Sequence, residues 1–204
     1  MDYKHKYNKY RSHYLTLKMN QTGYGNKEIY LIRHDETEWN KLKKGQGQEA
    51  DIPLNDTGKE QVKKTGLYLK NYRLETGQFD CLMASPMLRT KESAEIIKDI
   101  INYKDEIIYD DILKERKHGK LSGLTDEDEL MQQVKEFKKS LPVIEDPIEK
   151  YNNFNSVTNM INSEFNIGME NDEQLGNRVE PFIQKLINSS HKKILIIMPH
   201  PKII

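Results

Sequence analysis

Four short runs of apolar residues divide the chain, at residues 29–32, 79–84, 107–109 and 194–198. The apolar positions in these runs are mostly continuous and do not alternate with polar ones. Such continuity is typical of strands buried on both faces of a parallel sheet, whereas a strand with one wet face alternates. The four runs therefore predict four strands of a buried central sheet.

Helical patterns separate the predicted strands. Residues 57–60, with the sequence TGKE, predict a capping box that opens a helix carrying Val62 and Leu69. Ser85 as N-cap and Pro86 as the first helical residue predict a second helix. The apolar face of that helix is expected to hold Ala94, Ile97 and Ile101, and a third helix from about residue 172 is expected to hold Leu175, Val179, Phe182 and Leu186, with a kink at Pro181.

The alternation of strand and helix predicts an α/β fold with a doubly wound, mostly parallel sheet flanked by helices. Residues 1–27 are basic, tyrosine-rich and without apolar period, so we expect a flexible N-terminal extension and a domain over residues 28–204. An organelle-targeting peptide is the alternative, but such peptides favour arginine and this segment has one. Residues 142–171, rich in Asn, Glu and Ser, predict a long excursion or partly ordered cap.

Composition narrows the classes of partner. Lys and Arg total 32 and Asp and Glu total 32, so the net charge is zero and no global electrostatic attraction to nucleic acid or membrane is expected. The longest apolar run, residues 194–198, is far shorter than the ~18 residues of a bilayer span. Only 36% of residues are apolar, below the ~45–50% of an average chain. The single Cys81 excludes an internal disulfide and favours a reducing, cytoplasmic compartment.

Chemically useful side chains follow three of the predicted strands. Arg33 and His34 come directly after the first, and His200 follows the last. After the second strand comes Ser85 with the predicted helix N-terminus, whose opening turn carries Arg89. Ligands gather at the carboxyl ends of strands in such sheets, and free N–H groups with guanidinium groups favour an anion. The sequence therefore predicts a phosphate pocket at this edge.

Other reactive residue types are assigned no such role. Cys81 lies inside an apolar strand, where an inert buried thiol is expected. The remaining histidines, at positions 5, 13, 118 and 191, lack metal-ligand spacing, so no zinc site is expected. Trp39 fits either a binding platform or an anchor for the loop after the first strand.

Six segments follow one another between about Glu28 and His200: LIRHDETEWN, DIPLNDTGKEQ, ASPMLRTKESAEII, LKERKHGKLSGLT, NDEQLGNRVEPF and ILIIMPH. They resemble, in the same order, segments of the histidine phosphatase superfamily, the phosphoglycerate mutase-like proteins. LIRHDETEWN is similar to the family's Arg-His-Gly-Glu-Thr signature, and DIPLNDTGKEQ to its D-x-P-L-(T/S)-x-x-G-x-x-Q segment.

The resemblance implies a role for each matching residue. His34 would be the nucleophile that becomes a phosphohistidine, with Arg33, Arg89 and His200 around the phosphoryl group. Glu115 would be the general acid and base. Thr37 and Asn40 would hold the loop or the substrate, and Arg116 would bind substrate. Neutral imidazole is a good nucleophile at phosphorus, and positive charges carry most of the catalysis of phosphoryl transfer, so no metal or other cofactor is required.

These roles imply metal-independent hydrolysis of a phosphorylated small metabolite. Phosphoglycerate mutase activity is the alternative enzyme, because residues 113–124 also resemble the mutase loop. A catalytically weak phosphate-binding module is the alternative outside enzymes. No nucleic acid or membrane partner is expected, and a homodimer is left open.

The chain departs from the family pattern at three points. Asp35 replaces a glycine and puts a carboxylate beside a dianionic ligand, and Pro201 replaces another glycine. The chain ends at Ile204, so the domain looks short at its C-terminus. We expect the last strand to lack a covering layer on one face, and this form to be weakly active and marginally stable.

Overall fold

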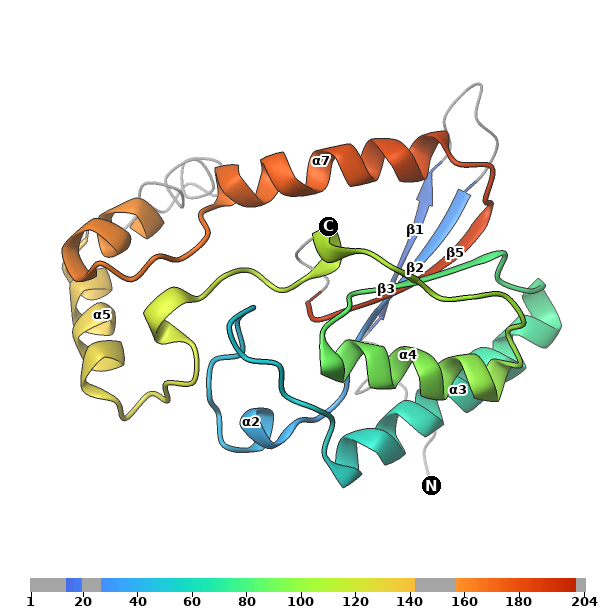
Figure 1. Ribbon diagram of the computed structural model, residues 1–204, viewed down its shortest axis with the longest axis horizontal. Coiled ribbons are helices and arrows are strands. Elements are labelled where there is room, and N and C mark those ends of the chain that lie inside the picture. The colour runs from blue at the N-terminus through green and yellow to red at the C-terminus, as the bar shows by residue number, and fades with distance from the viewer. Residues whose placement is uncertain (1–13, 20–26, 142–156, 201–204) are drawn as a thin grey trace.

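The computed structural model describes residues 14–19, 27–141 and 157–200. Five strands form one sheet in the order β1-β2-β5-β3-β4 (Figure 1). Their bounds are Tyr14–Met19 for β1, Lys27–Arg33 for β2, Cys81–Ala84 for β3, Ile108–Tyr109 for β4 and Lys193–Met198 for β5. Strands β2, β5, β3 and β4 are mutually parallel, which confirms the predicted mostly parallel sheet and all four predicted strands.

The described helices are α2 (Glu38–Lys41), α3 (Asp56–Thr76), α4 (Leu88–Ile101), α5 (Glu129–Ser140) and α7 (Asp172–Asn188), with short 3₁₀ turns η2 (Asp111–Leu113) and η3 (Gly119–Leu121). Residues 157–165 are also helical. Helices cover both faces of the sheet, as Figure 1 shows, with α7 on one side and α3 and α4 on the other. This arrangement confirms the flanked α/β fold.

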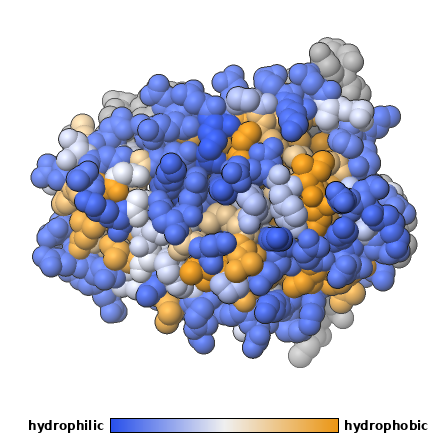
Figure 2. Space-filling view, viewed as in Figure 1, coloured by the Kyte–Doolittle hydropathy of each residue, from blue (hydrophilic) through white to orange (hydrophobic). Residues whose placement is uncertain are grey.

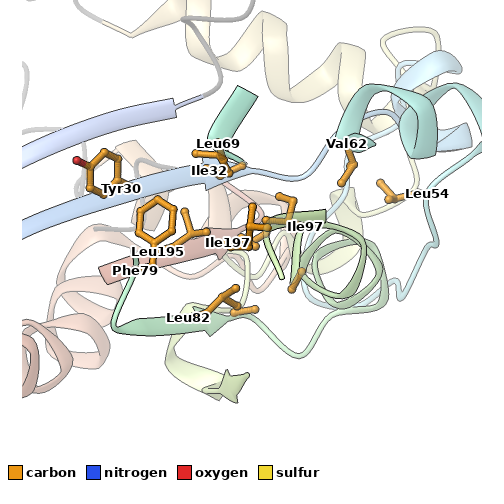
Figure 3. Close-up of a cluster of buried hydrophobic side chains, with 13 residues drawn as sticks. Tyr30, Ile32, Leu54, Val62, Leu69, Phe79, Leu82, Ile97, Leu195 and Ile197 are labelled. Carbon is orange, nitrogen blue, oxygen red and sulfur yellow. The ribbon is translucent and has the colours of Figure 1, made fainter. Parts of the chain in front are cut away.

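The first hydrophobic cluster joins the sheet to α3 and α4. Alternate residues of β2 and β5, among them Ile32 and Ile197, point toward Val62 of α3 and Ile97 of α4 (Figure 3). Because the strands are buried on both faces, the other alternate residues form a second cluster with Phe182 of α7. The predicted apolar faces of the three long helices are therefore confirmed.

Strand β5 occupies the middle of the sheet, between β2 and β3, and all six of its residues are buried. Ile197 packs toward α3 and α4, whereas Ile196 packs in the cluster that contains Phe182. The expectation that this strand lacks a covering layer is therefore wrong. The covering layer is α7, which precedes β5 in the chain, so no helix after β5 is needed to bury it.

Strand β1 lies within the segment predicted as an N-terminal extension. It pairs antiparallel with β2, and Tyr14 lies opposite Ile32. The apolar residues of its sequence, YLTLKM, alternate with polar ones, as is typical of an edge strand, so the expectation that this segment has no apolar period is wrong here. Residues 1–13 and 20–26 lie outside the described residues, so the flexible extension and the domain boundary at residue 28 stay predictions.

Two helices begin at residues other than those predicted. Helix α3 begins at Asp56, and Asn55 caps it by accepting a hydrogen bond from Gly58 N at 2.8 Å, so the predicted cap at Thr57 is wrong. Helix α4 begins at Leu88 with Met87 as N-cap, so the predicted Ser85 cap is also wrong. The third helix, α7, continues past Pro181.

A separate small core lies away from the sheet, at the left of Figure 1. Val134 of α5, Ile161 of the 157–165 helix, Leu121 and Ile167 pack together there. The second half of the predicted excursion therefore belongs to a packed cap, whereas residues 142–156 lie outside the described residues. Most of the surface in Figure 2 is hydrophilic, with hydrophobic patches between. No helix within the described ranges combines the length and the apolarity that a membrane crossing requires.

Candidate active site

The edge of the sheet where β2, β5 and β3 end carries the predicted site. Arg33 pairs with Met198 in the parallel register, and Ile197 pairs with Ala84. The backbone N–H of His34 donates to Met198 O at 3.2 Å, which fixes the chain as it leaves β2. The three strand ends are therefore level, and the residues after them meet at one edge, as the sequence predicted.

His34 is buried and its tautomer follows from its two hydrogen bonds. Nδ1 lies 2.6 Å from the carbonyl oxygen of Asp35, which can only accept, so Nδ1 carries the proton. Nε2 then carries the lone pair and accepts from Nε of Arg89 at 3.1 Å. Burial, with the charges of Arg89 and Arg33, holds the pKa of His34 well below its ordinary value. The imidazole is therefore neutral near pH 7, the form that can attack phosphorus.

Arg89 is a fully buried guanidinium in the first turn of α4. Besides its bond to His34, it donates from Nη1 to the carbonyl oxygen of Ala50 at 3.3 Å. Its Nη2 is buried and has no hydrogen-bond partner within the described part of the chain. Burying an unsatisfied charged donor is costly, so this arrangement favours an anion that accepts from Nη2 beside the imidazole.

Arg33 and His200 approach the same point from the two central strands. Nε of Arg33 donates to the carbonyl oxygen of Pro199 at 3.1 Å, the residue just before His200. His200 is partly exposed, and its charge acts to lower the pKa of His34, which places it close to the nucleophile. The predicted nucleophile and the three residues predicted around the phosphoryl group are thus brought together.

Glu115 reaches this group from the loop after η2. Burial lowers the pKa of both Arg33 and Arg89, and the nearby charge of Glu115 opposes that shift in each. The carboxylate therefore lies close to both guanidinium groups. Its Oε1 also accepts from the backbone N–H of Arg116 at 3.0 Å.

The loop that carries Glu115 is held from α7. Arg178 donates two bonds of 2.8 Å to the carboxylate of Glu170 and further bonds to the carbonyl oxygens of Ile112 and Lys114. Lys114 directly precedes Glu115. Charge-assisted bidentate bonds of this kind fix geometry as well as supply energy. Arg178 therefore restricts where the Glu115 backbone can lie.

Thr37 and Asn40 hold the loop after β2 together. Asn40 Oδ1 accepts from the backbone N–H of Thr37 at 3.1 Å, and the Thr37 hydroxyl accepts from the Asn40 N–H at 3.1 Å, a capping box for α2. The buried Thr37 hydroxyl also donates to Gln46 Oε1 at 2.9 Å. These contacts support the loop-holding role, and substrate contact by either residue stays a prediction.

Residues of the segment DIPLNDTGKEQ hold the turn at Glu36 through two hydrogen bonds and one close approach of the backbone. Asn55 Nδ2 donates to the Glu36 carboxylate at 2.8 Å, and Gln61 Oε1 accepts from the Glu36 backbone N–H at 3.2 Å. A Cβ added at Gly58 would lie 2.0 Å from the Glu36 carbonyl oxygen. Only glycine lets α3 approach so closely, which explains the spacing of these motif residues.

The N-terminus of α4 differs from the prediction. The free backbone N–H groups at this helix start were predicted to favour an anion, but the N–H of Leu88 donates to Asp51 Oδ1 at 2.6 Å. Asp51 thus accepts from the N–H next to Arg89, and the Ala50 carbonyl accepts from Arg89 itself. Neither residue was predicted to act in the site, although Asp51 begins the segment DIPLNDTGKEQ. The Leu88 N–H is thus already bonded, whereas the Arg89 guanidinium keeps a donor that can bind an anion.

The structure also bears on the predictions for Arg116, Trp39 and Cys81. Arg116 forms an ion pair with Asp172 at the start of α7, so its assignment to substrate stays a prediction. Gly123 lies against Trp39, because a Cβ added there would be 3.0 Å from the indole, and this contact supports the loop anchor. Burial raises the pKa of the Cys81 thiol to about 11, which is consistent with an inert thiol.

Of the two departures from the family glycines, one lies within the described residues. Burial raises the pKa of the Asp35 carboxyl to about 6, and the Arg33 guanidinium opposes this shift. Pro201 lies outside the described residues.

Within the described ranges, no three His, Cys, Asp or Glu side chains are grouped so that they could hold a metal ion.

Residues 29–204 match the histidine phosphatase superfamily, branch 1. The chain is 40% identical over 96 residues to an uncharacterized phosphatase, PhoE, of Bacillus subtilis, covering 47% of this chain and 46% of that protein. It is 36% identical over 97 residues to fructose-2,6-bisphosphatase TIGAR B of Danio rerio, covering 47% of this chain and 36% of that protein. The matches therefore span about half or less of these relatives' length.

A solved structure of similar fold is the phosphoglycerate mutase from Bacillus anthracis, with a TM-score of 0.67 and 21% identity. The superposition covers 86% of this chain and 75% of that one. This likeness supports the fold found above.

Proposed function

The chain belongs to the histidine phosphatase superfamily, branch 1, and we propose that it hydrolyses phosphomonoesters of small metabolites through a phosphohistidine on His34. The observation that carries this proposal is the pairing of a neutral buried imidazole with Arg89, whose Nη2 has no partner within the described part of the chain. An arginine so placed can bind a phosphoryl oxygen next to the nucleophilic nitrogen.

In the first half-reaction, a phosphoryl oxygen replaces Nε2 of His34 as the acceptor of the Arg89 Nε–H bond. The freed lone pair on Nε2 attacks phosphorus, and the bond from phosphorus to the ester oxygen breaks. Arg33 and Arg89 stabilise the charge on the equatorial oxygens, which is where most of the catalysis of phosphoryl transfer arises. Glu115 gives its proton to the leaving alkoxide, so the alcohol departs neutral. The Asp35 carbonyl oxygen, which accepts from Nδ1, stabilises the positive charge that forms on the ring.

In the second half-reaction, a water attacks the phosphohistidine opposite Nε2. Glu115, now ionised, accepts the water proton, and the electron pair of the P–N bond returns to Nε2. Inorganic phosphate leaves and the starting protonation states are restored. The positive charge needed at phosphorus comes from the guanidinium groups of Arg33 and Arg89, so we propose that no metal takes part.

The direct test is turnover of para-nitrophenyl phosphate and of a phosphorylated small alcohol by the full chain in the presence of EDTA. We expect phosphate release from both substrates, and loss of release in His34→Ala. Transfer of the phosphoryl group to an added acceptor alcohol, with little phosphate release, would favour the mutase. Phosphate binding without turnover would favour the non-catalytic module. A cytoplasmic location is also a proposal, resting on the single buried Cys81.

A further inference from the structure

Residues 45–51 form a strap that contacts three separate parts of the site. At its start, Gly45 N donates to Leu124 O at 2.9 Å, and Gly123 N donates to Gly45 O at 2.8 Å. At its end, Ala50 accepts from Arg89 and Asp51 accepts from Leu88 N. The strap therefore joins the segment after Glu115 to the helix that carries Arg89.

Glu49 makes the contact of the strap that lies nearest in sequence to Glu115. Its Oε1 accepts from the backbone N–H of Gly119 at 2.7 Å, and its Oε2 lies 3.3 Å from the backbone N of His118 as a second acceptor. These two N–H groups follow Glu115 by three and four residues. A carboxylate that accepts from two consecutive backbone N–H groups forms charge-assisted bonds, which are stronger than neutral ones.

The neighbouring residues leave little room for another arrangement. A Cβ added at Gly47 would lie 2.1 Å from Glu49 Oε2 and 2.8 Å from His118 N. Gly119 has a φ of 57°, and a Cβ added there would lie 2.1 Å from the carbonyl oxygen of Ile167. Both sides of the contact thus depend on glycine, which indicates a fixed approach of the strap to the loop.

We propose that Glu49 is a positioning residue for the general acid. It holds the C-terminal side of the Glu115 loop against the strap, while Arg178 holds the N-terminal side, so that the carboxyl faces the leaving oxygen. This inference rests on the proposed function, in which Glu115 protonates that oxygen. Glu49 itself is exposed and touches no reacting group.

The test compares an alkyl phosphate, glycerol phosphate, with para-nitrophenyl phosphate, whose leaving group needs no proton. Glu49→Ala should lower kcat on the alkyl ester about tenfold, a fraction of the ~100-fold that a 1 Å misplacement can cost. On the aryl ester kcat should stay within about twofold. Glu115→Gln is the reference and should show the same selectivity more strongly.

Two variants distinguish loss of the Glu49 hydrogen bonds from loss of its negative charge. Gly47→Ala should reproduce the alkyl-selective loss, because its Cβ displaces the Glu49 carboxylate without removing its charge. Glu49→Gln should recover much of the activity, since its amide oxygen still accepts from Gly119. Glu38→Ala is the matched control, because Glu38 is exposed on α2 and pairs with Lys41 of the same helix, at 3.7 Å. It should match the wild type on both esters.

Amide hydrogen exchange provides a second readout that does not depend on turnover. In Glu49→Ala, the amides of residues 118 and 119 should exchange at least about tenfold faster, while those of β5 stay unchanged. Wild-type exchange at these amides, wild-type kcat on both esters, or an equal loss on both esters in Glu49→Ala would overturn the inference while Glu115→Gln still upholds the proposed function. Equal losses on both esters in Glu115→Gln would instead refute the proposed role of Glu115, and this inference with it.

Discussion

Asp35 stands beside the nucleophile, and replacing it by asparagine should change both stability and substrate affinity. Burial raises the pKa of this carboxyl from 3.8 to about 6, against the opposing charge of Arg33. The folded protein therefore binds the Asp35 proton more tightly than the unfolded chain does. The stability that this proton supplies is fully present below pH 3.8 and is lost as the pH rises through about 6.

The shift from 3.8 to about 6 corresponds to about 3 kcal/mol at roughly 1.4 kcal/mol per pH unit. Asp35 is partly accessible, and solvent screening reduces this figure, so we expect about 2 kcal/mol. The asparagine side chain would carry no charge at any pH. Relative to the wild type, Asp35→Asn should therefore gain about 2 kcal/mol of unfolding free energy between pH 4 and pH 7.5.

Urea unfolding of both proteins at pH 4 and at pH 7.5 measures this difference directly, because groups shared by the two proteins cancel. At pH 7.5, KM for a phosphomonoester dianion should also fall in Asp35→Asn, since a negative charge is removed beside the phosphoryl site. A stability difference that is the same at both pH values would refute the reasoning and show that burial does not disfavour the ionised form of Asp35.

Two other changes test the site and the turn that supports it. Arg89→Lys should lower kcat about 30-fold, the equivalent of roughly 2 kcal/mol, because an ammonium cannot reproduce the planar fork of donors. Steady-state rates on para-nitrophenyl phosphate check this, and an unchanged rate would show that Arg89 does not stabilise the transition state. Gly58→Ala should destabilise the protein by about 1–3 kcal/mol because its Cβ would meet the Glu36 backbone. Gly176→Ala, where nothing lies within 4 Å of the added Cβ, should instead raise the melting temperature, and equal effects of the two would contradict this explanation.

The parallel strands and the faces of the long helices could be predicted because continuous apolar runs and helical spacing reflect burial directly. Strand β1 has no continuous apolar run: the apolar residues of its sequence, YLTLKM, alternate with polar ones, which is the pattern of a strand with one exposed face, and this signal was missed. The cover over β5 was missed for a different reason. Sequence order suggests that a covering helix should follow the strand, whereas α7 precedes it and packs back.

In the site, the residues after the strand ends could be predicted because a parallel register brings them to one edge. The strap could not, because Glu49 and Asp51 act through backbone N–H groups of segments far away in sequence. Every residue except proline has a backbone N–H, so such a partner cannot be recognised from the type of its side chain. The same holds for the start of α4, where Asp51 accepts from Leu88 N, while the Ser85 hydroxyl accepts from Met87 N at 3.4 Å.

Rapid quenching of the full chain during turnover of a labelled phosphomonoester tests the central claim most directly. Label should appear on the protein, bound to His34, in a linkage that is stable in base and labile in acid. His34→Ala should carry no label and release no phosphate. Normal phosphate release by His34→Ala, or turnover without any labelled protein in single-turnover experiments, would contradict a phosphohistidine mechanism.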